Sequence, residues 1–201
     1  MKNVVIFFAD GFEEVEAVTP LDYLRRADVQ AVSVSCGSGK EVTGAHGIGV
    51  ICDLTVREAL ARFPSGADAV VCPGGMPGAS NIASSKDAVS LILKTRDSGG
   101  ITAAICASPI VVFSRLGLLT GKTFTCYPGM EGDVEFWAGP GYEALMAAST
   151  KTNRAVETDG RLITGQGPGA AEEFALALIA AVGGPAAADT VQRAACLRPP
   201  R

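Results

Sequence analysis

Apolar runs alternate with amphipathic stretches along most of the chain. Val4 to Phe8 is a continuous apolar run that predicts a buried strand, and Phe12 to Ala27 carries apolar residues at the spacing of a helix. Ala31 to Val34 predicts a second strand. A strand, a helix and a strand in this order form a right-handed βαβ unit, so we expect a sheet that is at least partly parallel.

The rest of the chain continues this alternation, with two interruptions. Glycines between Glu41 and Asp53 predict a hairpin that leaves the main sheet, and Asp159-Gly160 predicts the turn of a second hairpin. Further strands are expected at 68–72, 101–105, 123–126, 155–158 and 162–164, and helices at 56–63, 87–97, 133–137, 170–182 and 186–197. No linker or repeat interrupts this pattern, which predicts a single domain, residues 1–201, of the doubly wound α/β class.

Cys106 lies where one of these strands is expected to end and a helix to begin. Pro109 is typical of a first helical turn, and the helix is expected to continue to Leu116. A sharp turn at this point needs small residues two positions before and after the cysteine, where Ala104 and Ser108 lie. Such a turn would expose the Cys106 side chain at the positive end of the helix, which favours a thiolate. The local sequence leaves one alternative open, a buried cysteine that packs as a small hydrophobic residue.

Ligands of open α/β sheets bind where loops leave the carboxyl ends of the strands. Four predicted loops lie there, namely Asp10–Glu16, Pro73–Gly78, Cys106–Ser108 and Cys126–Gly129. The second loop is glycine-rich, so it either forms a tight turn or lets the Gly75 amide approach a substrate. In the second case, the amides of Gly75 and Ala107 would form an oxyanion hole next to Cys106.

A cysteine nucleophile also needs a base or a proton carrier. His46 is the only histidine, and it lies in the first predicted hairpin without a neighbour that resembles a metal ligand, so a conventional Cys-His pair is not expected. Three glutamates lie in the first loop. We interpret Glu13 and Glu14 as surface charges that interact favourably with the helix dipole. Composition alone does not show which of the three glutamates, Glu13, Glu14 or Glu16, would act as the proton carrier.

Composition and charge exclude several classes of protein. The net charge of −4 argues against a general binder of nucleic acids or acidic membranes, and no apolar run is long enough to span a bilayer. The first apolar run is too short for a signal peptide, so we expect a cytoplasmic protein with free thiols. The six cysteines form no C-x-x-C pair, and neither a Walker motif nor a complete G-x-G-x-x-G follows the first strand. We therefore expect no metal and no nucleotide cofactor.

Four motifs resemble those of the ThiJ/PfpI superfamily, in particular its branch with the Parkinsonism-associated deglycase. They are Gly11–Ala17, Val71–Gly75, Ala103–Pro109 and Gly167–Gly169. The resemblance covers nearly the whole chain, and the motifs occur in the right order. The resemblance implies a three-layer α/β/α sandwich of the flavodoxin-like type, with a mostly parallel sheet, that usually forms a homodimer.

The resemblance also implies roles for individual residues. Cys106 matches the oxidation-prone nucleophile of the family, and Glu16 matches the buried acid that hydrogen-bonds it. Gly75 and Ala107 match the positions whose amides face the sulfur, and Gly74 lies beside them at the substrate site.

The chain departs from the family pattern in the loop Thr125-Cys126-Tyr127-Pro128. Many relatives carry a histidine there, whereas this chain offers Cys126 as a possible accessory group. Some members of the same branch also lack that histidine. His46 could instead enter the site from a partner subunit, because the family's dimer brings this hairpin near it.

These features predict a cysteine-dependent enzyme of deglycase or glyoxalase type without a cofactor. Its substrates would be reactive dicarbonyls or early glycation adducts on a protein or a nucleotide, with Cys106 as nucleophile and Glu16 as proton carrier. One alternative is a redox sensor or chaperone in which Cys106 is oxidised to sulfinate beside a protonated Glu16. A PfpI-like peptidase or amidase is the third possibility, weakened by the missing histidine.

Overall fold

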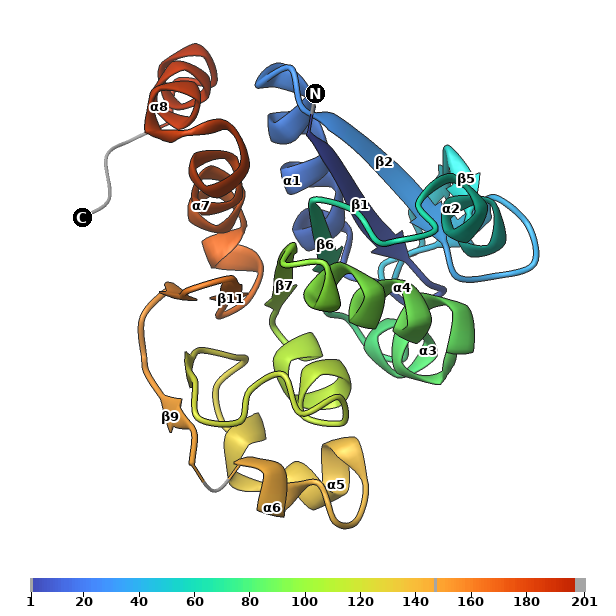
Figure 1. Ribbon diagram of the computed structural model, residues 1–201, viewed down its shortest axis with the longest axis vertical. Helices are drawn as coiled ribbons and strands as arrows, with labels where there is room; N and C mark the ends of the chain where they lie inside the picture. Colours follow the sequence, from blue (N-terminus) through green and yellow to red (C-terminus); the bar gives the residue numbers. More distant parts are fainter. Residues whose placement is uncertain (1, 147, 198–201) are drawn as a thin grey trace.

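A seven-stranded sheet crosses the molecule (Figure 1), which we describe from a computed structural model for residues 2–146 and 148–197. The strand order is β10-β11-β7-β6-β1-β2-β5, and every neighbouring pair is parallel except β10 and β11. The strands are β1 (Asn3–Phe8), β2 (Gln30–Ser35), β5 (Leu54–Thr55), β6 (Ala69–Cys72), β7 (Ile101–Ile105), β10 (Val156–Asp159) and β11 (Leu162–Gly165).

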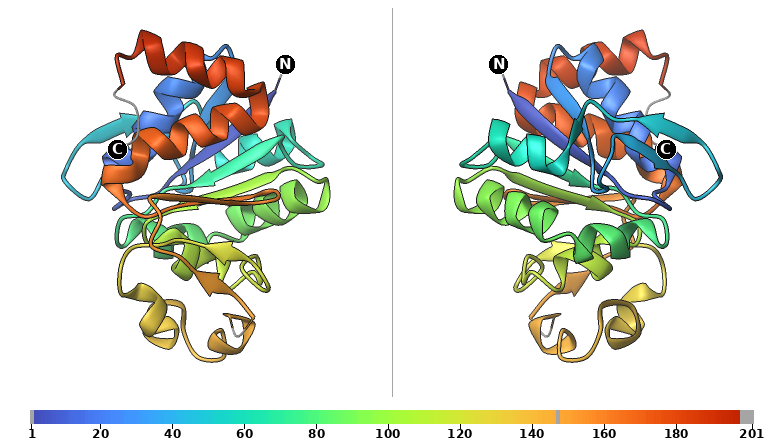
Figure 2. Two further views of the ribbon diagram at one scale, coloured as in Figure 1. Left: turned by 90° about the vertical axis from the view of Figure 1, so that its left-hand side faces the viewer. Right: turned by 90° about the vertical axis from the view of Figure 1, so that its right-hand side faces the viewer.

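Helices cover both faces of this sheet (Figures 1 and 2). One layer consists of α1 (Glu14–Arg26), α7 (Ala171–Gly183) and α8 (Pro185–Ala194). The other consists of α2 (Val56–Arg62), α3 (Gly78–Ser84) and α4 (Lys86–Asp97). Because both faces are covered, β6 and β7 are buried along their whole length, which explains their continuous apolar sequences. The predicted three-layer, flavodoxin-like sandwich is confirmed.

A hairpin of β3 (Glu41–Thr43) and β4 (Gly49–Ile51) extends away from the main sheet (Figure 2). Backbone hydrogen bonds attach it to the loop after β1. Gly11 N donates to Thr43 O at 2.8 Å, and Ala45 N donates to Phe12 O at 2.8 Å. The predicted hairpin is therefore confirmed, and it lies directly beside the start of α1.

A small lobe lies beyond the end of the sheet (Figure 1). It contains the parallel pair β8 (Thr123–Phe124) and β9 (Thr150–Lys151), a 3-10 turn at Met130–Gly132, and the short helices α5 (Val134–Ala138) and α6 (Glu143–Met146). The helix α5 packs against the segment that follows β7. This lobe therefore covers the end of the sheet at which Cys106 lies.

Several elements differ from the sequence-based expectations, and the short β5, β9 and α6 were not predicted. The helix expected from Pro109 to Leu116 is a single π-helical turn, Pro109–Phe113, in which Ser114 N donates to Pro109 O at 3.1 Å. The strand expected at 123–126 pairs only with β9, because β11 occupies the position beside β7 in the main sheet. The helix α3 was not predicted, since its first residues belong to the glycine-rich loop. Within the described residues, no helix is both long enough and apolar enough to cross a membrane.

Candidate active site

The backbone turns sharply at Cys106, directly after β7. Cys106 has a φ of +64°, a conformation that is uncommon for a residue with a side chain. Its amide donates to Gly165 O at 2.9 Å, and its carbonyl accepts from Tyr127 N at 2.8 Å. Two hydrogen bonds to other segments therefore hold the turn.

The loop after β6 approaches this turn so closely that only glycine fits. A Cβ atom added at Gly74 would lie 2.6 Å from Cys106 Cβ and 2.7 Å from Glu16 Oε2. One added at Gly75, where φ is +83°, would lie 2.5 Å from Gly11 O. Bare backbone at these two positions brings three loops of the sheet edge into contact.

Two further hydrogen bonds fix the loops to one another. Ser108, buried behind the turn, donates through Oγ to Pro73 O at 2.6 Å. Glu13 N donates to Gly74 O at 3.0 Å. The amides of Gly75 and Ala107 then face the sulfur of Cys106, where they lower the pKa of the thiol.

Glu16 is fully buried in the first turn of α1. Its Oε2 atom accepts a hydrogen bond from Gly74 N at 2.8 Å. Within the described part of the chain, Glu16 Oε1 has no hydrogen-bond partner of ordinary geometry, although the Cys106 thiol is close enough to lower the pKa of Glu16. Burial outweighs this effect and raises the pKa of Glu16 to about 7.

The electrostatics of Cys106 differ from the sequence-based expectation of a thiolate. Burial, followed by the negative charge of Glu16, raises the pKa of the Cys106 thiol well above its ordinary value. The expectation was wrong because a single π-helical turn follows the cysteine and because burial prevails over the amides. At neutral pH the Cys106 thiol therefore keeps its proton, and the Glu16 carboxyl group, with a pKa of about 7, is protonated in part of the molecules and can accept the thiol proton in the rest.

Cys106 forms part of the wall of a pocket of about 290 Å³. The residues that line this pocket are Gly75, Met76, Cys106, Ala107, Tyr127, Pro128, Gly129, Met130 and Trp137. Cys106 is only 9% exposed, so the expectation that the turn exposes its side chain was wrong, because neighbouring loops pack over it. A ligand reaches the sulfur through the pocket rather than from open solvent. We refer to this cavity as the Cys106 pocket.

Most of the side chains that line the Cys106 pocket were not predicted from the sequence. Tyr127 lies in the loop where the chain departs from the family pattern, but Cys126 was expected to be the functional residue of that loop. Met76 lies in the glycine-rich loop that the motifs identified, whereas Met130 and Trp137 follow in a segment with only weak helical periodicity. Apolar residues of this kind carry no local signal that they line a pocket.

The structure does not bring Cys126 into the Cys106 pocket. Cys126 is fully buried, with its sulfur 3.5 Å from Tyr127 O and 3.7 Å from Glu131 Oε2. Burial raises the pKa of the Cys126 thiol to about 12. An accessory role for this thiol therefore has no support in the geometry of this chain.

His46 lies between β3 and β4, outside the Cys106 pocket. Its Nδ1 atom is 2.8 Å from Glu14 Oε2 and 3.6 Å from Glu13 Oε2, and the hydrogen bond with Glu14 raises the pKa of His46. Glu14 is buried and accepts from His46 N at 2.7 Å, so its interpretation as a surface charge was wrong. The expectation that His46 lacks ligand-like neighbours was also wrong, since ligand atoms of these three residues lie within 4.8 Å of one another. Among the residues that the structure describes, Glu13, Glu14 and His46 form the group whose geometry could hold a metal ion.

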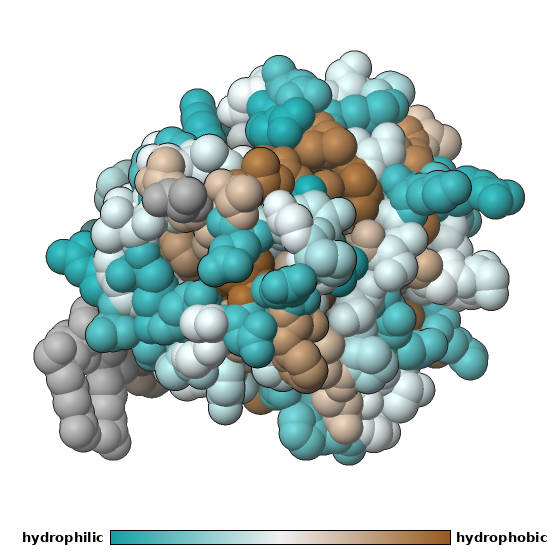
Figure 3. Space-filling model, turned by 90° about the horizontal axis from the view of Figure 1, so that it is seen from below, coloured by the Kyte–Doolittle hydropathy of each residue, from teal (hydrophilic) through white to brown (hydrophobic). Residues whose placement is uncertain are grey.

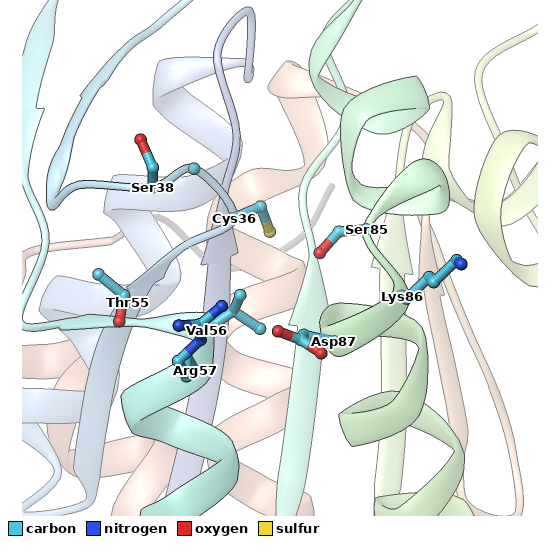
Figure 4. A pocket seen from close by; sticks show the side chains of 9 residues that line it. Cys36, Ser38, Thr55, Val56, Arg57, Ser85, Lys86 and Asp87 are labelled. Atoms are coloured by element: carbon cyan, nitrogen blue, oxygen red, sulfur yellow. The ribbon is translucent and has the colours of Figure 1, made fainter.

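A second pocket, of about 550 Å³, lies between the end of β2 and the starts of α2 and α4 (Figure 4). The residues that line it are Cys36, Gly37, Ser38, Thr55, Val56, Arg57, Ser85, Lys86 and Asp87, none of which belongs to the Cys106 pocket. Burial raises the pKa of the Cys36 thiol to about 12, so this cysteine stays protonated at neutral pH. The lining of the second pocket also includes none of the groups that surround Cys106, namely Glu16 and the amides of Gly75 and Ala107.

A mostly parallel α/β sandwich that carries a cysteine on a strained turn, beside a buried carboxylic acid, defines a class of cysteine-elbow α/β proteins. Over residues 2–181 the chain matches the DJ-1/PfpI family, and it belongs to that family. It is 36% identical over 180 residues to the Parkinson disease protein 7 homolog of Danio rerio. This match covers 89% of this chain and 88% of that protein.

Other relatives extend this comparison. Protein DJ-1 homolog B of Arabidopsis thaliana is 35% identical over 177 residues, covering 88% of this chain but only 37% of that protein, so the chain spans well under half its length. A solved structure named Toxoplasma gondii DJ-1, oxidized, superposes with a TM-score of 0.87 at 29% identity, covering 99% of this chain and 100% of that one. A Caenorhabditis elegans relative, 30% identical over 195 residues (96% of this chain, 95% of that protein), is named glutathione-independent glyoxalase DJR-1.2.

Proposed function

We propose that this chain is a cysteine-dependent enzyme of glyoxalase type, which converts reactive 2-oxoaldehydes to 2-hydroxy acids. The same chemistry would act on early glycation adducts, as a deglycase. The observation that carries this proposal is the juxtaposition of Cys106, on a strained turn, with the buried Glu16, whose Oε1 atom has no other partner among the described residues. The name of the Caenorhabditis elegans relative supports it.

In the first step, Glu16 takes the proton of Cys106 and the sulfur adds to the aldehyde carbon of the substrate. The electron pair of the carbonyl bond moves onto oxygen, where the amides of Gly75 and Ala107 donate hydrogen bonds to the developing oxyanion. Transfer of the proton from Glu16 to this oxygen yields a hemithioacetal. A carboxyl group with a pKa of about 7 suits such a transfer in both directions at neutral pH.

In the second step, the Glu16 carboxylate removes the proton from the former aldehyde carbon and returns it to the neighbouring ketone carbon, while the hydroxyl proton of the hemithioacetal passes to the ketone oxygen. The first carbon is thereby oxidised to a thioester and the second is reduced to an alcohol, so no external oxidant or reductant is needed. Water then cleaves the carbon–sulfur bond and releases the 2-hydroxy acid, and the sulfur regains its proton. Methylglyoxal would give lactate by this route.

The test is release of lactate from methylglyoxal by wild type and by a Cys106→Ser variant. We expect Cys106→Ser to lose activity by at least ~100-fold, because the hydroxyl is a far weaker nucleophile than a thiolate. Cys126→Ser makes the same chemical change at a cysteine outside the pocket and should retain wild-type activity. Lactate release by Cys106→Ser at the wild-type rate would dismiss the proposal.

A second candidate function is redox sensing, which the unpartnered Glu16 Oε1 atom specifically favours. Peroxide would oxidise the Cys106 thiolate to sulfenate, and a second equivalent would give sulfinate, with one water released at each step. A protonated Glu16 would donate a hydrogen bond to the sulfinate. Intact mass after mild peroxide treatment should then show a stable gain of two oxygens in wild type but not in Glu16→Leu, and an equal gain in both would reject this role.

A peptidase or amidase function has less support. Hydrolysis of this kind usually relies on a Cys-His pair, and the single histidine, His46, is bound to Glu14 outside the Cys106 pocket. A small-molecule substrate therefore remains our proposal.

We further propose a cytoplasmic homodimer. The described cysteines are free thiols, as expected for a reducing compartment. Exposed apolar side chains on α1 (Val15 and Val18) and on the hairpin segment (Ile48 and Ile51) suit an interface between two copies. Light scattering should give the mass of a dimer for wild type and a smaller mass for Val18→Asp, whereas a monomeric wild type would reject this assembly.

A further inference from the structure

The Cys106 pocket is apolar beyond the reacting groups. Its outer wall consists of Met76 in the loop after β6, Tyr127 and Met130 in the segment after β8, and Trp137 on α5. None of the described residues that line the pocket is charged. Figure 3 views the molecule from the end that carries α5 and α6, and apolar side chains reach the surface among the polar ones on this face.

This wall leaves apolar surface open to water in the absence of a ligand. Tyr127 is 50% exposed and Met76 is 42% exposed, although both are large hydrophobic residues in a structured region. The volume of about 290 Å³ is near the lower end for pockets that bind small organic molecules. Methylglyoxal has only a methyl group beyond its two carbonyls, so it would leave most of this wall uncovered.

We propose, on the basis of the function proposed above, that the preferred substrates are uncharged aromatic 2-oxoaldehydes. The dicarbonyl would lie at Cys106, and the aromatic ring would lie against Trp137 and the two methionines. Aromatic rings favour edge or offset contacts with Trp and Tyr, and the thioethers of Met76 and Met130 contact ring edges favourably.

Because none of the described residues that line the wall is charged, the pocket should also discriminate against charged substrates. A carboxylate or phosphate on the ring would lose its hydration in the pocket, and none of the described lining residues carries a charge that could compensate. Acidic aromatic aldehydes of the same shape are therefore poor substrates. The pocket thus selects for both an aromatic ring and electrical neutrality.

The kinetic test compares phenylglyoxal, methylglyoxal and 4-carboxyphenylglyoxal, each normalised to its rate of reaction with a free thiol in solution. We expect kcat/KM for phenylglyoxal to exceed the values for the other two by at least ~10-fold. Trp137→Ala and, separately, Met76→Ala should remove most of this preference, because they should lower kcat/KM for phenylglyoxal much more than kcat/KM for methylglyoxal. Leu145→Ala, an exposed apolar residue on α6 outside the pocket, is the matched control and should keep the preference. An equal preference in wild type and in both pocket variants would overturn the proposal.

A binding test separates this proposal from the proposed function. Trp137 is the only tryptophan, so its fluorescence reports on the pocket wall. Acetophenone lacks the aldehyde and should change this fluorescence saturably in wild type, whereas acetone and 4-carboxyacetophenone at equal concentrations should not. If no aldehyde is turned over but acetophenone binds in this way, the glyoxalase function fails and the aromatic specificity stands. If methylglyoxal is turned over but acetophenone leaves the fluorescence unchanged, the aromatic specificity is overturned.

Discussion

Deprotonation of Glu16 should destabilise the fold as the pH rises. Burial raises the pKa of Glu16 to about 7 in the folded protein, against the ordinary value of 4.5 for the unfolded chain. A group whose folded pKa is raised contributes stability that is fully present below the unfolded pKa and is lost as the pH rises through the folded pKa. The loss therefore falls between about pH 4.5 and pH 7, and at about 1.4 kcal/mol for each pH unit it amounts to about 3 kcal/mol.

The assay is urea unfolding from pH 4 to pH 8 for wild type and Glu16→Gln, followed by circular dichroism. The variant keeps a side chain that can accept the hydrogen bond from Gly74 N but cannot ionise, so its free energy of unfolding should not show the fall of about 3 kcal/mol. Other titrating groups contribute equally to both proteins, and only the difference between the two curves matters. Glu14→Gln is the control of opposite sign, because the pKa of Glu14 is lowered and its ionised form stabilises the fold at higher pH. Parallel curves for wild type and Glu16→Gln would refute the assignment of Glu16 as a buried acid with a raised pKa.

Two further predictions concern the packing around the site. Gly74→Ala places a Cβ atom 2.6 Å from Cys106 Cβ. The variant should therefore lower the free energy of unfolding by about 1–3 kcal/mol and reduce lactate release by ~100-fold. Wild-type activity in this variant would contradict the close contact. Glu14→Ala removes the acceptor for His46 N, so it should lower the free energy of unfolding by about 1–3 kcal/mol. Hydrogen exchange should show loss of protection at the His46 amide, and unchanged protection there would contradict the role of Glu14 in holding the hairpin.

The strands of the central sheet could be predicted because burial on both faces imposes continuous apolar runs, as in β6 and β7. The turn at Cys106 could be predicted as well, since small residues at 104 and 108 are a local requirement of a sharp turn. In both cases the constraint acts within a few residues along the chain. Such constraints leave a pattern that a single sequence reveals.

Other features depend on segments far apart in the chain. Glu14 was interpreted as a surface charge, because only the folded hairpin brings the amide of His46 to its carboxylate. The thiolate expected at Cys106 followed from a local helix dipole, whereas burial and the charge of Glu16 arise from the packing of α1 against the sheet. The aromatic and thioether wall of the Cys106 pocket likewise forms only when the lobe after β8 folds over the sheet edge.

The most direct test of the proposed roles of Cys106 and Glu16 is covalent trapping of methylglyoxal at Cys106. Protein should be mixed with methylglyoxal, quenched with acid, and its cysteine-containing peptides analysed by mass spectrometry, for wild type, Glu16→Gln and Cys106→Ser. Because Glu16 both accepts the thiol proton and carries the proton in the rearrangement, Glu16→Gln should form an adduct with the mass of one methylglyoxal on its Cys106 peptide more slowly than wild type does. It should then fail to convert this adduct, so at long reaction times the adduct persists in Glu16→Gln, with little in wild type. An adduct confined to another cysteine, or full lactate production by Glu16→Gln, would contradict the account.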